Sequence, residues 1–220
     1  MIGVLIVDDD TMTREALRDY IAADPTLEVV GEAADGEIAI RQAAALRPDV
    51  VLMDMQMPVL DGVAATAAIH AAHPEIRIIG LTTFATDRYV TPLLRAGASG
   101  YLVKDTRPRE ILAAIHAALA GESVLSPEVT RHVVAGLRES IPVITARDEA
   151  VASLFTAKEL DVIELLAQGF SNRQMAESLH VAESTVKARL VKIAARLGVH
   201  DRVQILVFAV LHGLVDLRGR

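Results

Sequence analysis

The sequence predicts a two-domain protein, in which an α/β domain is followed by an all-α domain. Five short apolar runs alternate with five helical patterns over residues 1–121, which indicates a doubly wound, five-stranded parallel sheet. Residues 154–220 instead contain four helical segments with well-marked ends, two of which form a helix-turn-helix. At 220 residues, the chain is long enough for two domains of ordinary size.

The expected strands are short runs of apolar residues. Residues 50–53 are four apolar residues in succession, which is typical of a strand buried on both faces, and Asp54 ends this strand. The five expected strands cover residues 2–7, 27–31, 50–54, 76–81 and 101–103.

Caps, prolines and glycines bound the expected helices of this domain. Asp10 or Thr11 can cap the first helix. We expect Thr106 to cap the last one, with Pro108 in the first turn, where a missing N–H costs little. Gly121 suits the left-handed position at its end. The five expected helices cover residues 13–23, 37–46, 63–73, 87–96 and 107–121.

Pro92 falls inside the fourth expected helix, where a proline ring costs roughly 3 kcal/mol. Either this helix begins near Thr91, so that Pro92 lies in its first turn, or the helix is bent. We therefore expect an unusual conformation over residues 86–91.

Polar side chains stand at the carboxyl ends of four of the five expected strands. In chain order they are Asp8, Asp9, Asp54, Thr82 and Lys104. The second strand ends without an obvious functional side chain, as expected of an edge strand. In a doubly wound sheet these strand ends converge on one crevice, where ligands bind.

These side chains together suit phosphoryl chemistry. Clustered carboxylates repel one another unless a cation lies among them, and oxygen ligands suit Mg²⁺. A carboxylate can also be a nucleophile that forms an aspartyl phosphate. Lys104 and Thr82 can neutralise and hydrogen-bond phosphoryl oxygens. Each residue alone has an ordinary explanation as a cap, a turn residue or a solvated charge, but their joint occurrence at strand ends favours a site.

Residues 122–153 are expected to connect the two domains. Ser126, followed by proline, is typical of a helix start, and this helix can extend to about residue 138. Mixed charge and the lack of a clear period predict a linker over residues 140–153. An ordered helix over residues 147–154 is the alternative.

Capping sequences mark the four helices of the C-terminal domain. They are the capping boxes of Thr156 with Glu159 and of Ser171 with Gln174, and the cap Asp201. A short helix, a tight turn and a longer helix over residues 183–197 form a helix-turn-helix signature. The longer helix carries the basic residues Lys187, Arg189, Lys192 and Arg196. On an amphipathic helix such residues can alternatively form a solvated face.

Charge and composition narrow the class of protein. Residues 1–121 carry 10 Lys and Arg against 17 Asp and Glu, whereas residues 156–220 carry nine against seven, which hints at a different partner for the C-terminal domain. Disulfides and thiolate metal sites are excluded because there is no cysteine. Since the sequence also shows no long apolar run and no signal peptide, we expect a cytoplasmic protein without a membrane partner.

Residues 1–121 resemble the receiver domain of bacterial two-component response regulators, which has a CheY-like, flavodoxin-like sheet. The resemblance rests on four motifs, Val7-Asp8-Asp9-Asp10, Met53–Pro58 with Asp61-Gly62, Leu81-Thr82-Thr83, and Gly100–Asp105. It implies that Asp54 accepts a phosphoryl group from a sensor histidine kinase. Asp9, Asp54 and the backbone carbonyl of Gln56 would hold Mg²⁺ or Mn²⁺, and Asp8 would act mainly through metal-bound water.

The same resemblance implies a switch. Lys104 would pair with the phosphate, Thr82 would be the hydroxyl that moves towards it, and Tyr101 would be the aromatic residue that turns inward with Thr82. From the pattern alone, Tyr101 is an ordinary core residue, so its role rests on the resemblance.

The C-terminal region resembles the DNA-binding domain of the LuxR/NarL (FixJ) family. The motifs that carry this resemblance are Phe155–Glu159, Gly169–Asn172, Thr185-Val186-Lys187 and Leu197-Gly198. The family implies that the third helix enters the major groove of promoter DNA and that the fourth contacts a second subunit. By position, the residues expected at the DNA are Thr185, Lys187, Ala188, Arg189, Val191 and Lys192.

Some positions depart from this family pattern. Ala182 stands where a capping serine is common, which loses about 1 kcal/mol of helix stability and one phosphate contact. Ala188 and Val191 are apolar, so base reading would lean on thymine methyl groups. These departures bear on the operator sequence and leave DNA binding itself expected.

Together the two resemblances predict a transcriptional response regulator, in which phosphorylation at Asp54 controls homodimerisation and promoter binding. It would not be an enzyme with an external substrate, and catalysis of its own dephosphorylation is left open. One alternative is a metal-dependent phosphohydrolase with Asp8 as nucleophile, because Asp8-x-Asp10 has the required spacing, although Met12 replaces the usual Thr or Val. The other is a DNA-binding regulator that ignores phosphate.

Overall fold

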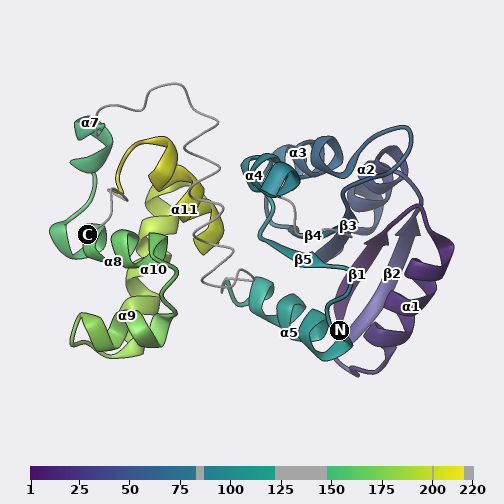
Figure 1. The fold of residues 1–220 in the computed structure, drawn as a ribbon, viewed down its shortest axis with the longest axis horizontal. Helices are drawn as coiled ribbons and strands as arrows, with labels where there is room; N and C mark the ends of the chain where they lie inside the picture. The colour runs from purple at the N-terminus through teal and green to yellow at the C-terminus, as the bar shows by residue number, and fades with distance from the viewer. Residues whose placement is uncertain (83–86, 122–147, 200, 216–220) are drawn as a thin grey trace. The chain divides into compact units, whose positions relative to one another are not determined.

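The computed structural model describes residues 1–82, 87–121, 148–199 and 201–215. The chain divides into two compact units, Met1–Val124 and Leu125–Arg220, which are described separately. The first is an α/β unit and the second is helical (Figure 1), as the sequence predicts.

A parallel sheet with the strand order β2-β1-β3-β4-β5 forms the centre of the first unit. The strands are β1 (Ile2–Val7), β2 (Leu27–Ala33), β3 (Val50–Asp54), β4 (Arg77–Thr82) and β5 (Gly100–Val103). In the middle of the sheet, Leu52 is paired with Ile6 on one side and with Ile79 on the other. Every residue of β3 is buried, and β2 is an edge strand as predicted.

Helices cover both faces of this sheet (Figure 1). α1 (Thr11–Ala22) and α5 (Pro108–Leu119) lie on one face. α2 (Gly36–Leu46), α3 (Gly62–Ala72) and α4 (Asp87–Arg95) lie on the other. The core under α1 and α5 includes Val4, Ile6, Leu17, Ile21, Leu52, Ile79, Ile111 and Ile115.

The helix ends follow the predicted capping chemistry with one exception. Asp10 caps α1, and its carboxylate accepts hydrogen bonds from the backbone N–H groups of Met12 and Thr13. The prediction that Thr106 caps α5 is wrong. Pro108 occupies the first helical position, which makes Arg107 the N-cap residue, and Arg107 makes no capping hydrogen bond through its side chain.

Pro92 lies inside α4, which begins at Asp87. A helix start near Thr91 is therefore wrong. The carbonyl of Pro92 accepts a hydrogen bond from the backbone N–H of Ala96, so the helical turn continues past the proline. The first residue of the segment expected to be unusual, Thr86, lies outside the described residues.

The second unit contains α7 (Glu149–Ala152), α8 (Ala157–Ala167), α9 (Asn172–Ser178), α10 (Glu183–Leu197) and α11 (Arg202–Leu211). Both predicted capping boxes and the Asp201 cap are present. Gly198 ends α10 in the left-handed conformation, at φ 68°. Residues buried between the helices include Val162, Ile163, Leu166, Met175, Val186, Ile193 and Leu206.

The predicted connector is described only in part, because the helix expected from Ser126 lies outside the described residues. At its end, α7 confirms the ordered-helix alternative for Glu149–Ala152 and corrects the expected linker there. The carboxylate of Asp148 caps this helix, and His212 Nδ1 lies 3.3 Å from Asp148 Oδ2, so α7 is fastened to the end of α11.

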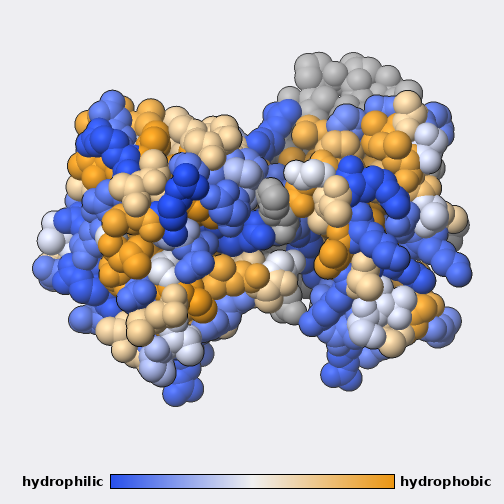
Figure 2. Space-filling model, turned by 180° about the vertical axis from the view of Figure 1, so that it is seen from behind, coloured by the Kyte–Doolittle hydropathy of each residue, from blue (hydrophilic) through white to orange (hydrophobic). Residues whose placement is uncertain are grey.

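The surface of both units intersperses hydrophilic and hydrophobic residues over the face seen in Figure 2. Within the described ranges, no helix is both long enough and apolar enough to cross a membrane.

Candidate functional site

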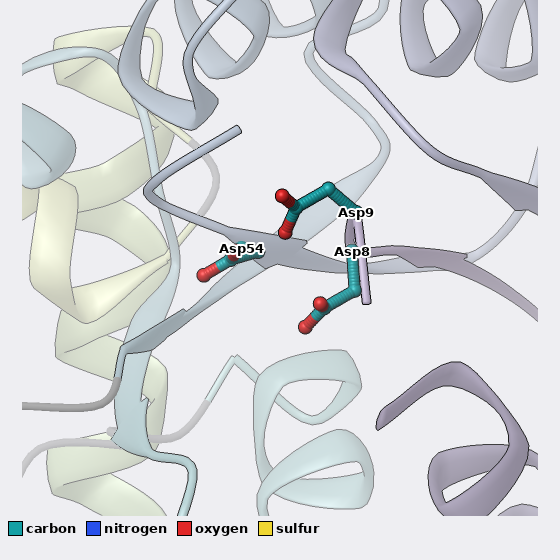
Figure 3. Close-up of side chains that lie close together, drawn as sticks. All are labelled: Asp8, Asp9 and Asp54. Atoms are coloured by element: carbon teal, nitrogen blue, oxygen red, sulfur yellow. The ribbon is translucent and has the colours of Figure 1, made fainter. Parts of the chain in front are cut away.

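The carboxyl ends of β1 and β3 bring three carboxylates together (Figure 3). Asp54 is the last residue of β3, and Asp8 and Asp9 follow β1 directly. One carboxylate oxygen from each residue lies within 4.8 Å of the others. Asp8 and Asp54 are only 0% and 4% exposed, whereas Asp9 is exposed to solvent. Solvent therefore reaches the cluster at Asp9, whereas the protein shields Asp8 and Asp54 from it.

Lys104, just beyond β5, bridges the two buried carboxylates. Its Nζ lies 2.7 Å from Asp8 Oδ2 and 3.2 Å from Asp54 Oδ1. Burial raises the pKa of Asp54, and the charge of Asp8 raises it further against the opposing effect of Lys104. Burial acts to lower the pKa of Lys104, but the Asp8 and Asp54 carboxylates outweigh it and the pKa of Lys104 is raised. Lys104 is thus held as a cation.

The two carboxylate oxygens of Asp8 have different neighbours. Oδ1 accepts a hydrogen bond from the backbone N–H of Asp10 at 3.0 Å. Oδ2 is buried and faces the Lys104 ammonium without a well-directed hydrogen bond from the described residues. Lys104 offsets one of the three negative charges. The residual charge and the all-oxygen donor set suit a hard divalent cation that keeps several waters.

The remaining predicted residues of this site lie on β4, on β5 and after β3. Thr82 and Tyr101 are buried, and the Thr82 carbonyl accepts a hydrogen bond from the backbone N–H of Lys104 at 2.6 Å. The backbone N–H of Gln56 hydrogen-bonds the carboxylate of Asp54 and acts to lower its pKa, while the residue itself is exposed. Asp8, Asp9, Asp54, Gln56, Thr82 and Lys104 therefore lie at the carboxyl end of the sheet, whereas Tyr101 lies within β5, opposite Gly80 of β4.

α10 carries the residues predicted to contact DNA. Lys187, Ala188, Val191 and Lys192 are exposed, and Thr185 and Arg189 are half-buried. Val191 is 68% exposed, which is high for a large apolar side chain on a packed helix. Ala182 occupies the N-cap position without a side-chain hydrogen bond, as predicted from its lack of a polar group.

Arg196 belongs to the packing of the helical unit, although it is basic and lies on the same helix. Its Nη1 donates hydrogen bonds to Glu159 Oε2 and to the Leu154 carbonyl, both at 2.8 Å. Its guanidinium also lies 5.5 Å from the centre of the Phe155 ring. Arg196 therefore links α10 to the start of α8.

Comparison with known proteins supports both halves of this description. The family model "Response regulator receiver domain" matches residues 4–116, and "Bacterial regulatory proteins, luxR family" matches residues 153–209. An uncharacterized transcriptional regulatory protein YxjL of Bacillus subtilis is 40% identical over 98% of both chains. The transcriptional regulatory protein LiaR of the same organism is 38% identical over 98% of this chain and 100% of its own.

The chain belongs to the LuxR family of two-component response regulators.

Solved structures agree with this assignment. The response regulator ChrA of a heme-sensing two-component system is 33% identical, with a TM-score of 0.52, over 97% of this chain and 98% of that chain. A LuxR-family response regulator from Aurantimonas is 34% identical, with a TM-score of 0.56, over 60% of this chain and 95% of that chain. The response regulator thus combines a receiver with a DNA-binding unit and acts in transcription.

The loop that follows Asp54 in this response regulator is tightly packed and strained. A Cβ at Gly62 would lie 2.0 Å from the Asp54 carbonyl oxygen, so glycine is required there. Leu60 N donates to the Pro58 carbonyl at 2.8 Å around Val59, whose φ is 68°. This is a γ-turn with positive φ, which is rare and strained, at a β-branched residue.

Two residues of the receiver were missed in the sequence. Glu32 stands near the end of β2, which runs to Ala33 and so extends two residues past the expected end of this strand at residue 31. Glu32 accepts hydrogen bonds from Arg14 and Arg18, and Arg14 contacts the backbone of the Asp8-Asp9 segment. The signal that the sequence offers for this contact is the spacing of Arg14 and Arg18, one helical turn apart, together with an acid, Glu32, near the end of the next strand.

Proposed function

We propose that Asp54 accepts a phosphoryl group from a sensor histidine kinase and that this modification controls promoter binding. The observation that carries the proposal is the buried Asp54 carboxylate, set among Asp8, Asp9 and the Lys104 ammonium. A kinase and promoter DNA would both be met in the cytoplasm.

In the transfer, an oxygen of the ionised Asp54 carboxylate forms a bond to phosphorus while the phosphorus–nitrogen bond of phosphohistidine breaks, and the released imidazole takes up a proton. Asp54 must be ionised to attack, yet burial and Asp8 favour its neutral form. Lys104 opposes them and lies where it can neutralise phosphoryl oxygens. Loss of the group by reaction with water, assisted by the same residues, would reset the receiver.

The residues that would hold Mg²⁺ or Mn²⁺ are Asp8, Asp9, Asp54 and the backbone carbonyl of Gln56. When bound, the cation supplies positive charge that offsets the carboxylates and the incoming phosphoryl oxygens. Thr82 on β4 and Tyr101 on β5, both buried, would be the residues of the switch. Their movement would give the phosphorylated receiver a surface that differs from that of the unphosphorylated receiver.

Phosphorylation would favour a homodimer, so that two copies of α10 enter adjacent major grooves. Lys187, Ala188 and Val191 would face bases, with Thr185, Arg189 and Lys192 nearer phosphates. Support comes from the exposure of Lys187, Ala188, Val191 and Lys192, and from the match of residues 153–209 to the luxR-family model.

The test is intact mass and light scattering of the full chain after treatment with acetyl phosphate and Mg²⁺. Wild type should gain one phosphoryl group and shift from monomer to dimer, and Asp54→Ala should do neither. Asp19→Ala, at an exposed acid on α1, is the control and should behave like wild type. If Asp54→Ala still gained a phosphoryl group, Asp54 would not be the acceptor. If wild type gained the group but stayed monomeric by light scattering, phosphorylation would not control dimerisation.

A further inference from the structure

We infer that Arg14 is a positioning residue that holds the Asp8-Asp9 segment in the conformation that binds a divalent cation. The inference rests on the proposed function of Asp8, Asp9 and Asp54 as the cation site, and it adds a residue outside that ligand set.

The guanidinium of Arg14 contacts the backbone of both acids. Nη1 donates to the Asp8 carbonyl at 2.8 Å and to the Asp9 carbonyl at 3.3 Å, and Nη2 donates to Thr11 Oγ1 at 3.0 Å. Both carbonyls lie beyond Val7, the last residue of β1, and beyond the Asp8 N–H, which still donates to the Ala33 carbonyl of β2 at 3.1 Å. The planar fork of an arginine can bridge two such acceptors, whereas a lysine ammonium is a flexible point charge.

Asp9 needs this support more than its two neighbours. Asp8 and Asp54 are buried and are held by Lys104, whereas Asp9 is exposed. The backbone sets the position of the Asp9 Cβ, and with it the positions that this exposed carboxylate can reach. By holding the carbonyl groups of Asp8 and Asp9, Arg14 limits the backbone rotations that would move the Asp9 Cβ away from Asp54.

Glu32 in turn holds Arg14 in place. Arg14 Nε lies 3.4 Å from Glu32 Oε2, and Arg18 Nε donates to Glu32 Oε1 at 2.8 Å. The side chain of Arg14 is only 15% exposed, against 49% for Arg18. The two arginines share one acid, but only Arg14 reaches the acidic loop in the described part of the chain. Arg18 is therefore a matched control of the same charge on the same helix.

Positioning and simple charge predict opposite results. If Arg14 acted only as a nearby positive charge, its removal would make the cluster more negative and tighten cation binding. If it positions Asp9, its removal loosens a ligand and weakens binding. Loss of partners that orient metal ligands typically weakens affinity by roughly 10–100-fold.

The experiment measures binding of Mn²⁺ alone to the full chain by electron paramagnetic resonance, with Mg²⁺ as competitor, and thermal melting in metal-free buffer. Arg14→Met should raise the Mn²⁺ Kd roughly tenfold. Arg14→Lys should give an intermediate Kd and is the variant to use if Arg14→Met does not fold. Arg18→Met should bind Mn²⁺ like wild type.

Three results would overturn the inference: wild-type affinity in a folded Arg14→Lys or Arg14→Met protein, tighter binding in either, or an equal loss in Arg18→Met. As a separate outcome, wild type without saturable binding that depends on Asp54 would reject the proposed cation site, and the inference with it. Saturable binding by wild type together with unchanged Arg14 variants would reject the inference alone.

Discussion

Asp54 has a raised pKa in the folded receiver, so its ionised form lowers the stability of the resting protein. An acid whose folded pKa lies above its unfolded value binds its proton more tightly in the native state. The tighter binding of this proton stabilises the folded state fully below the unfolded pKa, near 3.8. This stabilisation is lost as pH rises through the folded pKa. At neutral pH the site is thus less stable than a neutral replacement would be.

Asp54→Asn is therefore expected to raise the Tm of the receiver transition by a few degrees in metal-free buffer, since about 1 kcal/mol corresponds to roughly 2–8 °C for domains that bracket the receiver in size. The gain should be larger at pH 8 than at pH 4, and added Mg²⁺ should reduce it because a cation offsets the charge of the wild-type site. Scanning calorimetry of the full chain measures this. Asp19→Asn is the control, and a lower Tm for Asp54→Asn would contradict the argument.

The acids and Lys104 could be found in the sequence because each stands at the end of an apolar run, and parallel strands place such ends together. Arg14 and Glu32 could not be found in this way. Their contacts are hydrogen bonds to backbone carbonyls and an ion pair between a helix and an edge strand. Such contacts depend on the approach of two elements in space, which no periodicity records.

At the scale of elements, α10 is joined to α8 through Arg196 and Glu159. Glu159 is 8% exposed at its side chain, and its pKa is lowered to about 2, chiefly by Arg196 and also by the backbone of Thr156. A depressed pKa means that this stabilisation is present above the unfolded value of 4.5 and is lost as pH falls through about 2.

Glu159→Gln should isolate this ion pair, because glutamine can still complete the capping box with Thr156. We expect the unfolding free energy of the helical unit to fall by about 1.5–3 kcal/mol at pH 6, the range for a hydrogen bond to a charged group. Amide hydrogen exchange of α8 and α10 measures it, and the difference from wild type should shrink by pH 2.5.

Glu177→Gln is the matched control, since Glu177 forms an exposed pair with Arg173 on α9. It should change stability by no more than about 0.5 kcal/mol. Equal effects of the two substitutions would show that the buried setting of Glu159 contributes nothing.

The start of α10 offers an independent test. Ala182→Ser should supply the missing side-chain acceptor and stabilise the helical unit by about 1 kcal/mol, measured by exchange of the α10 amides. Ala195→Ser, at an exposed position inside the same helix, should be neutral or slightly destabilising. A gain in both variants would mean that capping is not the cause.

Element boundaries were predictable wherever a residue type satisfies a helix end by itself, as Asp10, Asp201 and both capping boxes do. The prediction that Thr106 caps α5 is wrong because Pro108 takes the first helical position, which makes Arg107, one residue later, the N-cap residue. The four residues of α7 are too few to show a period, and its cap residue Asp148 pairs with His212, which lies far along the chain.

At the scale of the whole molecule, the N-terminal and C-terminal parts of the chain differ in net charge. Residues 156–220 carry a small excess of basic residues, nine against seven, and residues 1–121 are strongly acidic, with 17 acidic against 10 basic. One C-terminal unit therefore offers few phosphate contacts, and each contact contributes about −0.9 to the slope of log K against log salt.

If phosphorylation pairs two chains on promoter DNA, the magnitude of this slope should about double on treatment with acetyl phosphate, because the contacts double. Fluorescence anisotropy with labelled promoter DNA at several salt concentrations measures the slope. Asp54→Ala should keep the shallow slope under both conditions. An unchanged slope in phosphorylated wild type would contradict a paired mode of binding.

At Val59, the effect of backbone strain can be measured apart from the effect of side-chain contacts. Its side chain is 74% exposed, so few atoms would register a replacement, yet its positive φ disfavours every residue that branches at Cβ. A library of all substitutions at this position should therefore rank by conformational preference, with Gly and Asn above Val and with Ile and Thr beside it, whatever their hydrophobicity. A surface site chosen for its lack of contacts would then be among the most selective in the chain.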